Sequence, residues 1–94
     1  MHFVLFYDVV DDYVTKRAPY REAHLALVRA AYGRGELVLA GALTDPADGA
    51  LLVFRGASPE AAESFAKLDP YVTNGVVRAW RVRQWNTVIG DGIP

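Results

Sequence analysis

The side chain best suited to chemistry in this sequence is His24. The chain has two histidines, and the other, His2, stands at the amino terminus. An imidazole titrates near neutral pH and is costly to bury without a partner, so it suits a general base or acid in a pocket. The alternative is a core histidine bonded to a backbone carbonyl. At about 100° per residue, His24 shares the apolar side of its predicted helix with three residues, Leu27, Val28 and Ala31.

Asp69 is the candidate partner of His24. One further helical turn beyond Phe65 places Asp69 on the inward side of a second predicted helix. An inward carboxylate there could meet His24, where it would fix the ring tautomer and raise the basicity of the other nitrogen. The alternative is structural, because Asp-Pro commonly caps a following helical turn.

Three further side chains could contact a ligand beside this pair. Arg17 and Arg21 precede His24 near the positive end of its helix, where an anionic group is favoured. An ordinary solvated helix start is the alternative, and it suits Arg21 better than Arg17. Tyr71 follows the Asp-Pro pair and could line the same cleft or simply pack in the core.

Composition excludes several classes of function. The chain has no cysteine, which excludes thiolate nucleophiles, disulfides and thiolate metal sites. Its formal net charge of −1 gives no broad positive field for nucleic acid or an anionic membrane. Gly33-Arg34-Gly35 lacks the lysine and hydroxyl of a phosphate loop, and the 45–49 turn lacks the spacing of a calcium loop. We therefore expect no metal and no organic cofactor.

The amino terminus shows no cationic leader followed by a cleavable apolar stretch. No apolar run approaches the length of a membrane span. These features predict a cytoplasmic protein with no membrane partner.

The elements that must position the candidate residues follow from periodicity and turn signals. The sequence predicts a first strand over 3–10, a helix from about Pro19 to Arg34, and a hairpin of strands joined by the Asp-Pro and Asp-Gly pairs. Ser58-Pro59-Glu60 starts a second helix that Asp69-Pro70 ends. The remaining predicted segments are the hairpin strands 37–43 and 50–55, a short turn over 71–75, a fourth strand over 76–88, and a tail over 90–94.

This βαββαβ order predicts one α+β domain over 1–94, with a ferredoxin-like four-stranded antiparallel sheet and both helices on one face. The first strand is apolar on both sides, and so is the strand over 50–55. A sheet face that apolar seldom stays in water. We therefore expect a sheet-on-sheet homodimer through the open face. A cover from the tail is the alternative.

Several stretches of this sequence match the pattern of a known family. They are Lys16-Arg17-Ala18-Pro19-Tyr20-Arg21-Glu22-Ala23-His24-Leu25, Gly35-Glu36-Leu37, Ala40-Gly41-Ala42-Leu43, and Asp69-Pro70-Tyr71-Val72 with Gly75. With these stretches the sequence resembles the YCII-related (YciI-like) family, and the resemblance spans nearly the whole chain as a single YCII-related domain. It implies a dimeric α+β barrel fold and a His–Asp pair in a cleft, carried here onto His24 and Asp69, with Arg17 matching a family arginine. It also implies lyase or dehydrohalogenase work on small cyclic or aromatic compounds.

The leading hypothesis is a small cofactor-free enzyme in which His24 acts as general base or acid on a small anionic or cyclic substrate. Asp69 would orient His24, and Arg17 would hold an anionic group. Elimination or proton-transfer isomerisation suits this set of side chains, which includes no activated nucleophile and no redox group. Two alternatives stay open: a non-catalytic metabolite-binding module using the same cleft, and a haem-associated monooxygenase-like protein with His24 as axial ligand.

Overall fold

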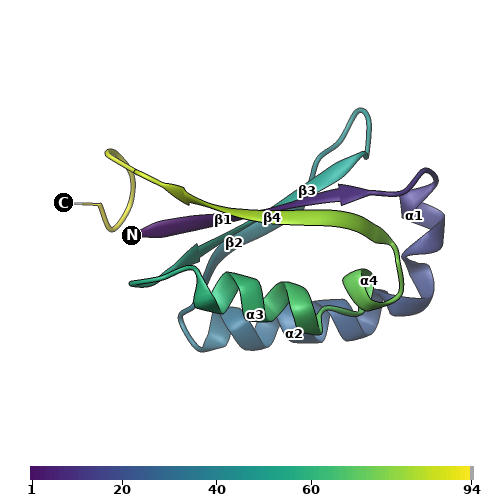
Figure 1. The fold of residues 1–94 in the computed structure, drawn as a ribbon, viewed down its shortest axis with the longest axis horizontal. Helices are drawn as coiled ribbons and strands as arrows, with labels where there is room; N and C mark the ends of the chain where they lie inside the picture. Colours follow the sequence, from purple (N-terminus) through teal and green to yellow (C-terminus); the bar gives the residue numbers. More distant parts are fainter. Residues whose placement is uncertain (94) are drawn as a thin grey trace.

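The structure, a computed structural model, describes residues 1–93. Four antiparallel strands form one sheet in the order β2-β3-β1-β4. The helices lie on one face of this sheet, and the other face carries none (Figure 1). The elements are β1 (His2–Val9), α1 (Tyr13–Lys16), the 3₁₀ turn η1 (Ala18–Tyr20), α2 (Arg21–Gly33), β2 (Leu37–Ala42), β3 (Gly49–Arg55), α3 (Glu60–Leu68), α4 (Pro70–Thr73) and β4 (Val77–Trp85).

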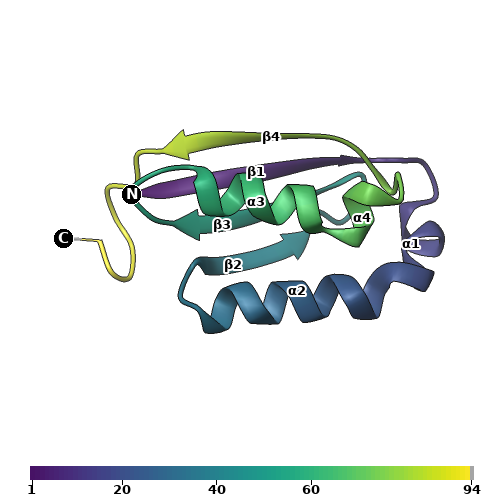
Figure 2. The same ribbon diagram turned by 60° about the horizontal axis from the view of Figure 1, so that its bottom comes forward.

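The α+β class and the ferredoxin-like strand order are thereby confirmed, with α2 and α3 side by side over the sheet (Figure 2). The predicted domain and its tail both end at residue 94, which lies outside the described residues. Within residues 1–93, no helix has both the length and the hydropathy needed to span a bilayer.

The core lies between the helices and the alternate residues of the central strands. Leu5 of β1 lies opposite Leu52 of β3, and both are buried. The Phe54 ring packs at 5.5 Å from the ring of Phe65 on α3. The helices contribute small buried residues at their contacts with the sheet, namely Ala31, Ala62 and Ala66, and small side chains let a helix approach a sheet closely.

The helix predicted from about Pro19 to Arg34 is present as α2, but its α-helical part begins at Arg21, and the short helix α1 before it was not predicted. Helical structure begins at Tyr13 with α1, passes through η1, and only then continues as α2 from Arg21. Pro19 lies in the 3₁₀ turn because it has no N–H and cannot continue the hydrogen-bond ladder of a preceding helix. The buried Tyr13 ring anchors α1 to the core.

The last strand also ends before its predicted boundary, at Trp85 rather than residue 88. The N–H of Thr87 donates to the carbonyl of Trp85, which turns the chain away from the sheet. The Thr87 hydroxyl lies 2.7 Å from Nδ1 of His2, so the segment after β4 is tied to the start of β1.

A β-bulge in β2 decides which side chains face the helices. Leu37 lies opposite Phe54, whereas Leu39 lies opposite Val53, so the alternation shifts by one residue between them. Leu37 is buried under the helices, but Leu39 is 65% exposed. Because cross-strand partners share a face, the same shift turns Ala40 and Ala42 toward α2.

The face of the sheet without helices carries mainly apolar side chains, as the double-sided pattern of the strands predicts, together with Arg81 and Arg83. The guanidinium carbon of Arg81 lies 4.3 Å from the centre of the Phe6 ring. Leu39 and Trp85 are largely exposed on this side of the sheet. We use the name helix-free face for the set Val4, Phe6, Leu39, Leu51, Val53, Arg81, Arg83 and Trp85.

We predict that Phe54→Ala lowers the free energy of unfolding by about 3–5 kcal/mol, since Phe54 is 1% exposed and its loss leaves a cavity under α3. Denaturant titration followed by circular dichroism measures this. Leu68→Ala is the control, because Leu68 is 67% exposed on α3 and should change stability by at most about 0.5 kcal/mol. Equal losses in both variants would contradict this description of the core.

Candidate active site

The structure brings His24 and Asp69 together. His24 lies on α2 with 14% of its side chain exposed, and its Nδ1 is 2.9 Å from both Oδ1 and Oδ2 of Asp69. The inward phase of the two helices predicted this meeting. The contact joins residues that are 45 positions apart in the chain.

Asp69 occupies the junction between α3 and α4. Its backbone is extended, with φ −67° and ψ 123°, as expected for a residue before proline. Its Oδ1 accepts a hydrogen bond from the backbone N–H of Tyr71 at 3.0 Å, which caps α4. The capping interpretation and the partner interpretation of Asp69 therefore hold together, because one carboxylate makes both contacts.

Tyr7, from the centre of β1, gives Asp69 its third hydrogen bond. The Tyr7 hydroxyl donates to Oδ2 of Asp69 at 2.6 Å. Burial, reinforced by the charge of Asp69 and the bond to it, raises the pKa of Tyr7 above its ordinary value. The hydroxyl thus stays protonated at neutral pH and acts as a donor.

This hydrogen-bond set determines the tautomer of His24. Donors to both oxygens of Asp69 favour its ionised form, which can only accept. Nδ1 therefore carries the ring hydrogen, and in the neutral imidazole the lone pair is on Nε2. Nε2 of His24 has no hydrogen-bond partner among residues 1–93. Because every fully buried side-chain nitrogen or oxygen in this range does have such a partner, Nε2 must be accessible to solvent. An imidazole arranged in this way can take a proton from a bound molecule.

Two aromatic rings fix the plane of the imidazole. The Tyr71 ring stacks on it at 3.9 Å with an interplanar angle of 5°, and the Phe65 ring meets it edge-on at 6.4 Å. Burial is the main cause that raises the pKa of Tyr71 above its ordinary value. Tyr71, predicted to line a cleft or pack, does both: it is buried against His24 and also borders the pocket.

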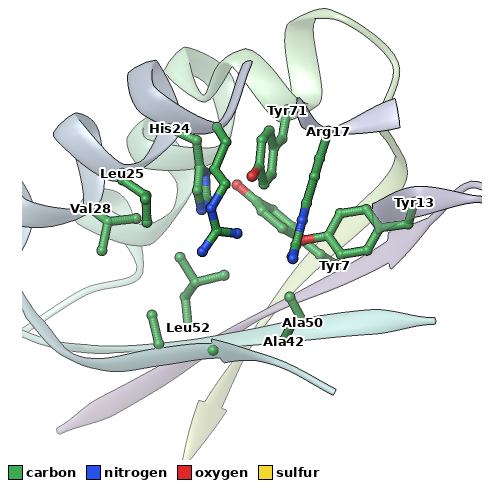
Figure 3. Close-up of a pocket in the computed structure, with 13 residues that line it drawn as sticks. Tyr7, Tyr13, Arg17, His24, Leu25, Val28, Ala42, Ala50, Leu52 and Tyr71 are labelled. Carbon is green, nitrogen blue, oxygen red and sulfur yellow. The ribbon is translucent and has the colours of Figure 1, made fainter. Parts of the chain in front are cut away.

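His24 faces a pocket of about 330 Å³ between α2 and the strands β2 and β3. Ala42, Ala50 and Leu52 lie across the pocket from His24 on the sheet side (Figure 3). Such a volume lies at the small end of the range for ligand sites. The bulge in β2 contributes to this space, because it turns small side chains toward α2.

Both predicted arginines line this pocket. The Arg17 side chain extends into the pocket (Figure 3). Its guanidinium carbon lies 4.9 Å from the centre of the Tyr13 ring. Arg21 also lines the pocket. Among residues 1–93, neither arginine forms an ion pair with a carboxylate. The pocket is therefore positively charged and can attract an anionic ligand.

Sequence reasoning missed Tyr7, Tyr13 and the small residues Ala42 and Ala50. Tyr7 had a usable signal, since its hydroxyl interrupts an inward row that is otherwise Phe3, Leu5 and Val9. Tyr13 and Ala42 had none, because α1 and the bulge were not predicted, whereas Ala50 follows the inward alternation of β3 with Leu52 and Phe54. In the described part of the chain, no three His, Cys, Asp or Glu side chains gather closely enough to hold a metal ion.

Comparisons with known proteins agree with this architecture. The chain is 31% identical to Protein YciI of Escherichia coli O6:H1 over 97 aligned positions, which cover 94% of this chain and 99% of that protein. Protein YciI of Shigella flexneri matches to the same extent.

A solved structure shares the fold with a TM-score of 0.75 at 20% identity, covering 92% of this chain and 94% of that one. It is the 5-chloro-2-hydroxyhydroquinone dehydrochlorinase TftG from Burkholderia phenoliruptrix AC1100, in complex with 2,5-dihydroxybenzoquinone. The sequence model of the YCII-related domain matches residues 1–86 of this chain. The chain therefore belongs to the YCII-related family.

Proposed function

We propose that this protein is a small-molecule enzyme that uses His24 as a general base or acid, oriented by Asp69. The observation that carries the proposal is the open Nε2 of an imidazole whose Nδ1 is bonded to a fully buried carboxylate. The pocket that Nε2 faces also contains two arginines without carboxylate partners among residues 1–93. A proton acceptor beside unpaired positive charge suits proton removal from a small anionic substrate.

The proposed reaction is an elimination or a proton-transfer isomerisation. In the elimination, Nε2 of His24 takes a proton from a ring hydroxyl and delivers it to the carbon that bears the halogen, which gives the keto tautomer. The halide ion then leaves with the electrons of its bond to carbon, while a second hydroxyl gives its proton to Nε2 and its electron pair completes the quinone. Asp69 stabilises the imidazolium, and Arg17 and Arg21 stabilise the negative charge on the substrate oxygens. The balance needs no oxidant or reductant.

The proposed substrate class is a small halogenated ring carrying several hydroxyl groups. The related dehydrochlorinase is named for 5-chloro-2-hydroxyhydroquinone and was solved with 2,5-dihydroxybenzoquinone. Compounds of this kind combine a flat apolar ring with oxygens that ionise readily. The positive pocket with its alanine-lined wall supports the same class for this chain.

We predict that His24→Gln lowers kcat for chloride release from 5-chloro-2-hydroxyhydroquinone by about 10²–10⁴-fold, because glutamine cannot take the proton. Asp69→Asn should lower kcat by a similar factor. The asparagine amide can donate a hydrogen bond to Nδ1 of His24, which places the ring hydrogen on Nε2 and removes the proton acceptor. A chloride electrode follows the reaction, and circular dichroism checks the fold. Full activity of a folded His24→Gln variant would contradict the proposal.

The binding-module alternative has its own signature in the same experiment. Saturable binding of 2,5-dihydroxybenzoquinone, measured by calorimetry, with no chloride release from the chlorinated compound would indicate that the pocket only holds its ligand. His24→Gln would then weaken binding without a catalytic effect.

We predict that Ala42→Leu lowers kcat/KM for the same substrate by about ten- to a hundredfold, because the larger side chain fills the pocket opposite α2. Steady-state kinetics on the purified variant measures this. Ala26→Leu is the matched control, since Ala26 is exposed on α2 and does not border the pocket. An unchanged kcat/KM in Ala42→Leu would show that the substrate does not occupy this space.

We also propose that two copies pair through the helix-free face. This face combines apolar side chains of all four strands with a depression of about 320 Å³ over β1, β3 and β4. An apolar surface of this extent favours burial, and a self-complementary face gives a closed twofold dimer. The cytoplasmic location and the lack of a nucleic-acid partner stay predictions from the sequence.

We predict that the double variant Leu39→Lys/Leu51→Lys is monomeric, because two ammonium groups per subunit add to Arg81 and Arg83 on the same face and oppose pairing. Light scattering at micromolar concentration measures the mass. Leu68→Lys is the control, because Leu68 is 67% exposed on α3, away from this face, and should leave a dimer. A monomeric unsubstituted protein would remove the dimer proposal.

A further inference from the structure

Tyr7 has no part in the mechanism proposed above, yet it is bonded to the centre of the site. It lies on β1 with 4% of its surface exposed, and its hydroxyl reaches Oδ2 of Asp69, 62 residues away in the chain. At 2.6 Å, this is the shortest side-chain hydrogen bond around Asp69. Short bonds of this kind are typical of a hydroxyl donating to a charged oxygen.

The donors on Asp69 hold its carboxylate in one orientation. The backbone N–H of Tyr71 occupies Oδ1 from α4, and the Tyr7 hydroxyl occupies Oδ2 from β1. Rotation of the carboxylate would break one or both bonds, and a buried acceptor without its donor is costly. Nδ1 of His24 therefore meets the carboxylate in a fixed position, at 2.9 Å from each oxygen.

We infer that Tyr7 is a positioning residue for His24 that acts through Asp69. Its hydroxyl keeps the carboxylate ionised and oriented, which keeps the ring hydrogen on Nδ1 and the lone pair on Nε2. The inference rests on the proposed function for its consequence in catalysis. The tautomer itself is a property of the free protein and can be measured without a substrate.

Loss of the Tyr7 hydroxyl leaves Oδ2 buried without that donor. The carboxyl group can then meet its bonding needs by taking up a proton and donating it to Nδ1. The ring hydrogen moves to Nε2, which can no longer accept a proton from a substrate.

The titratable and charged groups around the pair are Tyr7 of β1, Tyr13 of α1, Arg17 after α1, Arg21 of α2 and Tyr71 of α4, while α3 presents the apolar Phe65.

Nitrogen NMR of histidine-labelled protein tests this inference, with Tyr7→Phe as the variant. On acidification, the unsubstituted protein should pass from the Nδ1–H form to an imidazolium with both nitrogens protonated. Tyr7→Phe should instead accumulate the neutral Nε2–H form, because the added proton goes to Asp69. If Tyr7→Phe titrates through the same ring forms as the unsubstituted protein, Tyr7 does not position the pair.

Tyr13→Phe is the matched control for the ring forms. Tyr13 is also buried and borders the same pocket, and no hydrogen bond joins it to Asp69 among residues 1–93. Its loss should leave the Nδ1–H form and the imidazolium in place. The same change in both variants would assign the effect to the pocket in general and overturn the inference.

A second comparison separates action through Asp69 from direct action. With 5-chloro-2-hydroxyhydroquinone, Tyr7→Phe should lower kcat/KM by roughly tenfold, and more at acid pH than at alkaline pH. The same substitution added to Asp69→Asn should cause no further loss, because Tyr7 acts through the carboxylate that is already gone. An equal loss in both backgrounds would overturn the inference. If the compound is not a substrate, the kinetic comparison fails but the NMR result still decides the role of Tyr7.

Discussion

The burial of one carboxylate constrains the rest of this structure. Asp69 is 0% exposed, and a charge removed from water is strongly destabilising unless hydrogen bonds replace its hydration. The donors come from three elements: Tyr7 of β1, His24 of α2 and the backbone of Tyr71 in α4. The sheet and two helices must therefore meet at one point, with each donor aimed at it.

The same requirement creates the candidate site. Because the carboxylate holds Nδ1 of His24, the opposite side of the imidazole is left toward the space between α2 and the sheet. The stacked Tyr71 ring prevents the imidazole from tilting. Protein side chains leave this space open because the β2 bulge brings the small Ala40 and Ala42 toward the helix and places Leu39 on the other face. The residues that satisfy the buried carboxylate of Asp69 are thus the same ones that direct the imidazole of His24 toward the pocket.

The sheet separates two surfaces with different proposed uses. Leu5 and Tyr7 of β1 face the helices and the pocket, whereas Val4 and Phe6 face away from them. The alternation of side chains along a strand places these two sets on opposite sides. The proposed dimer contact therefore leaves the pocket side of the sheet uncovered, and changes on the helix-free face can be separated from changes in the site.

The sequence by itself determined the local features of this protein. Periodicity and turn chemistry predicted the order of the strands and the two main helices, the inward direction of His24, the break at Asp69-Pro70 and the apolar character of both sheet faces. Each of these depends on how a side chain is directed relative to its own element. Tertiary structure alone decided the bond from Tyr7 to Asp69, the shift in β2 and the short helix at Tyr13. The hydrogen bond and the β2 shift depend on how separate elements are placed and registered against one another. The short helix depends on a place for the Tyr13 ring in the core. A local sequence pattern encodes neither of these.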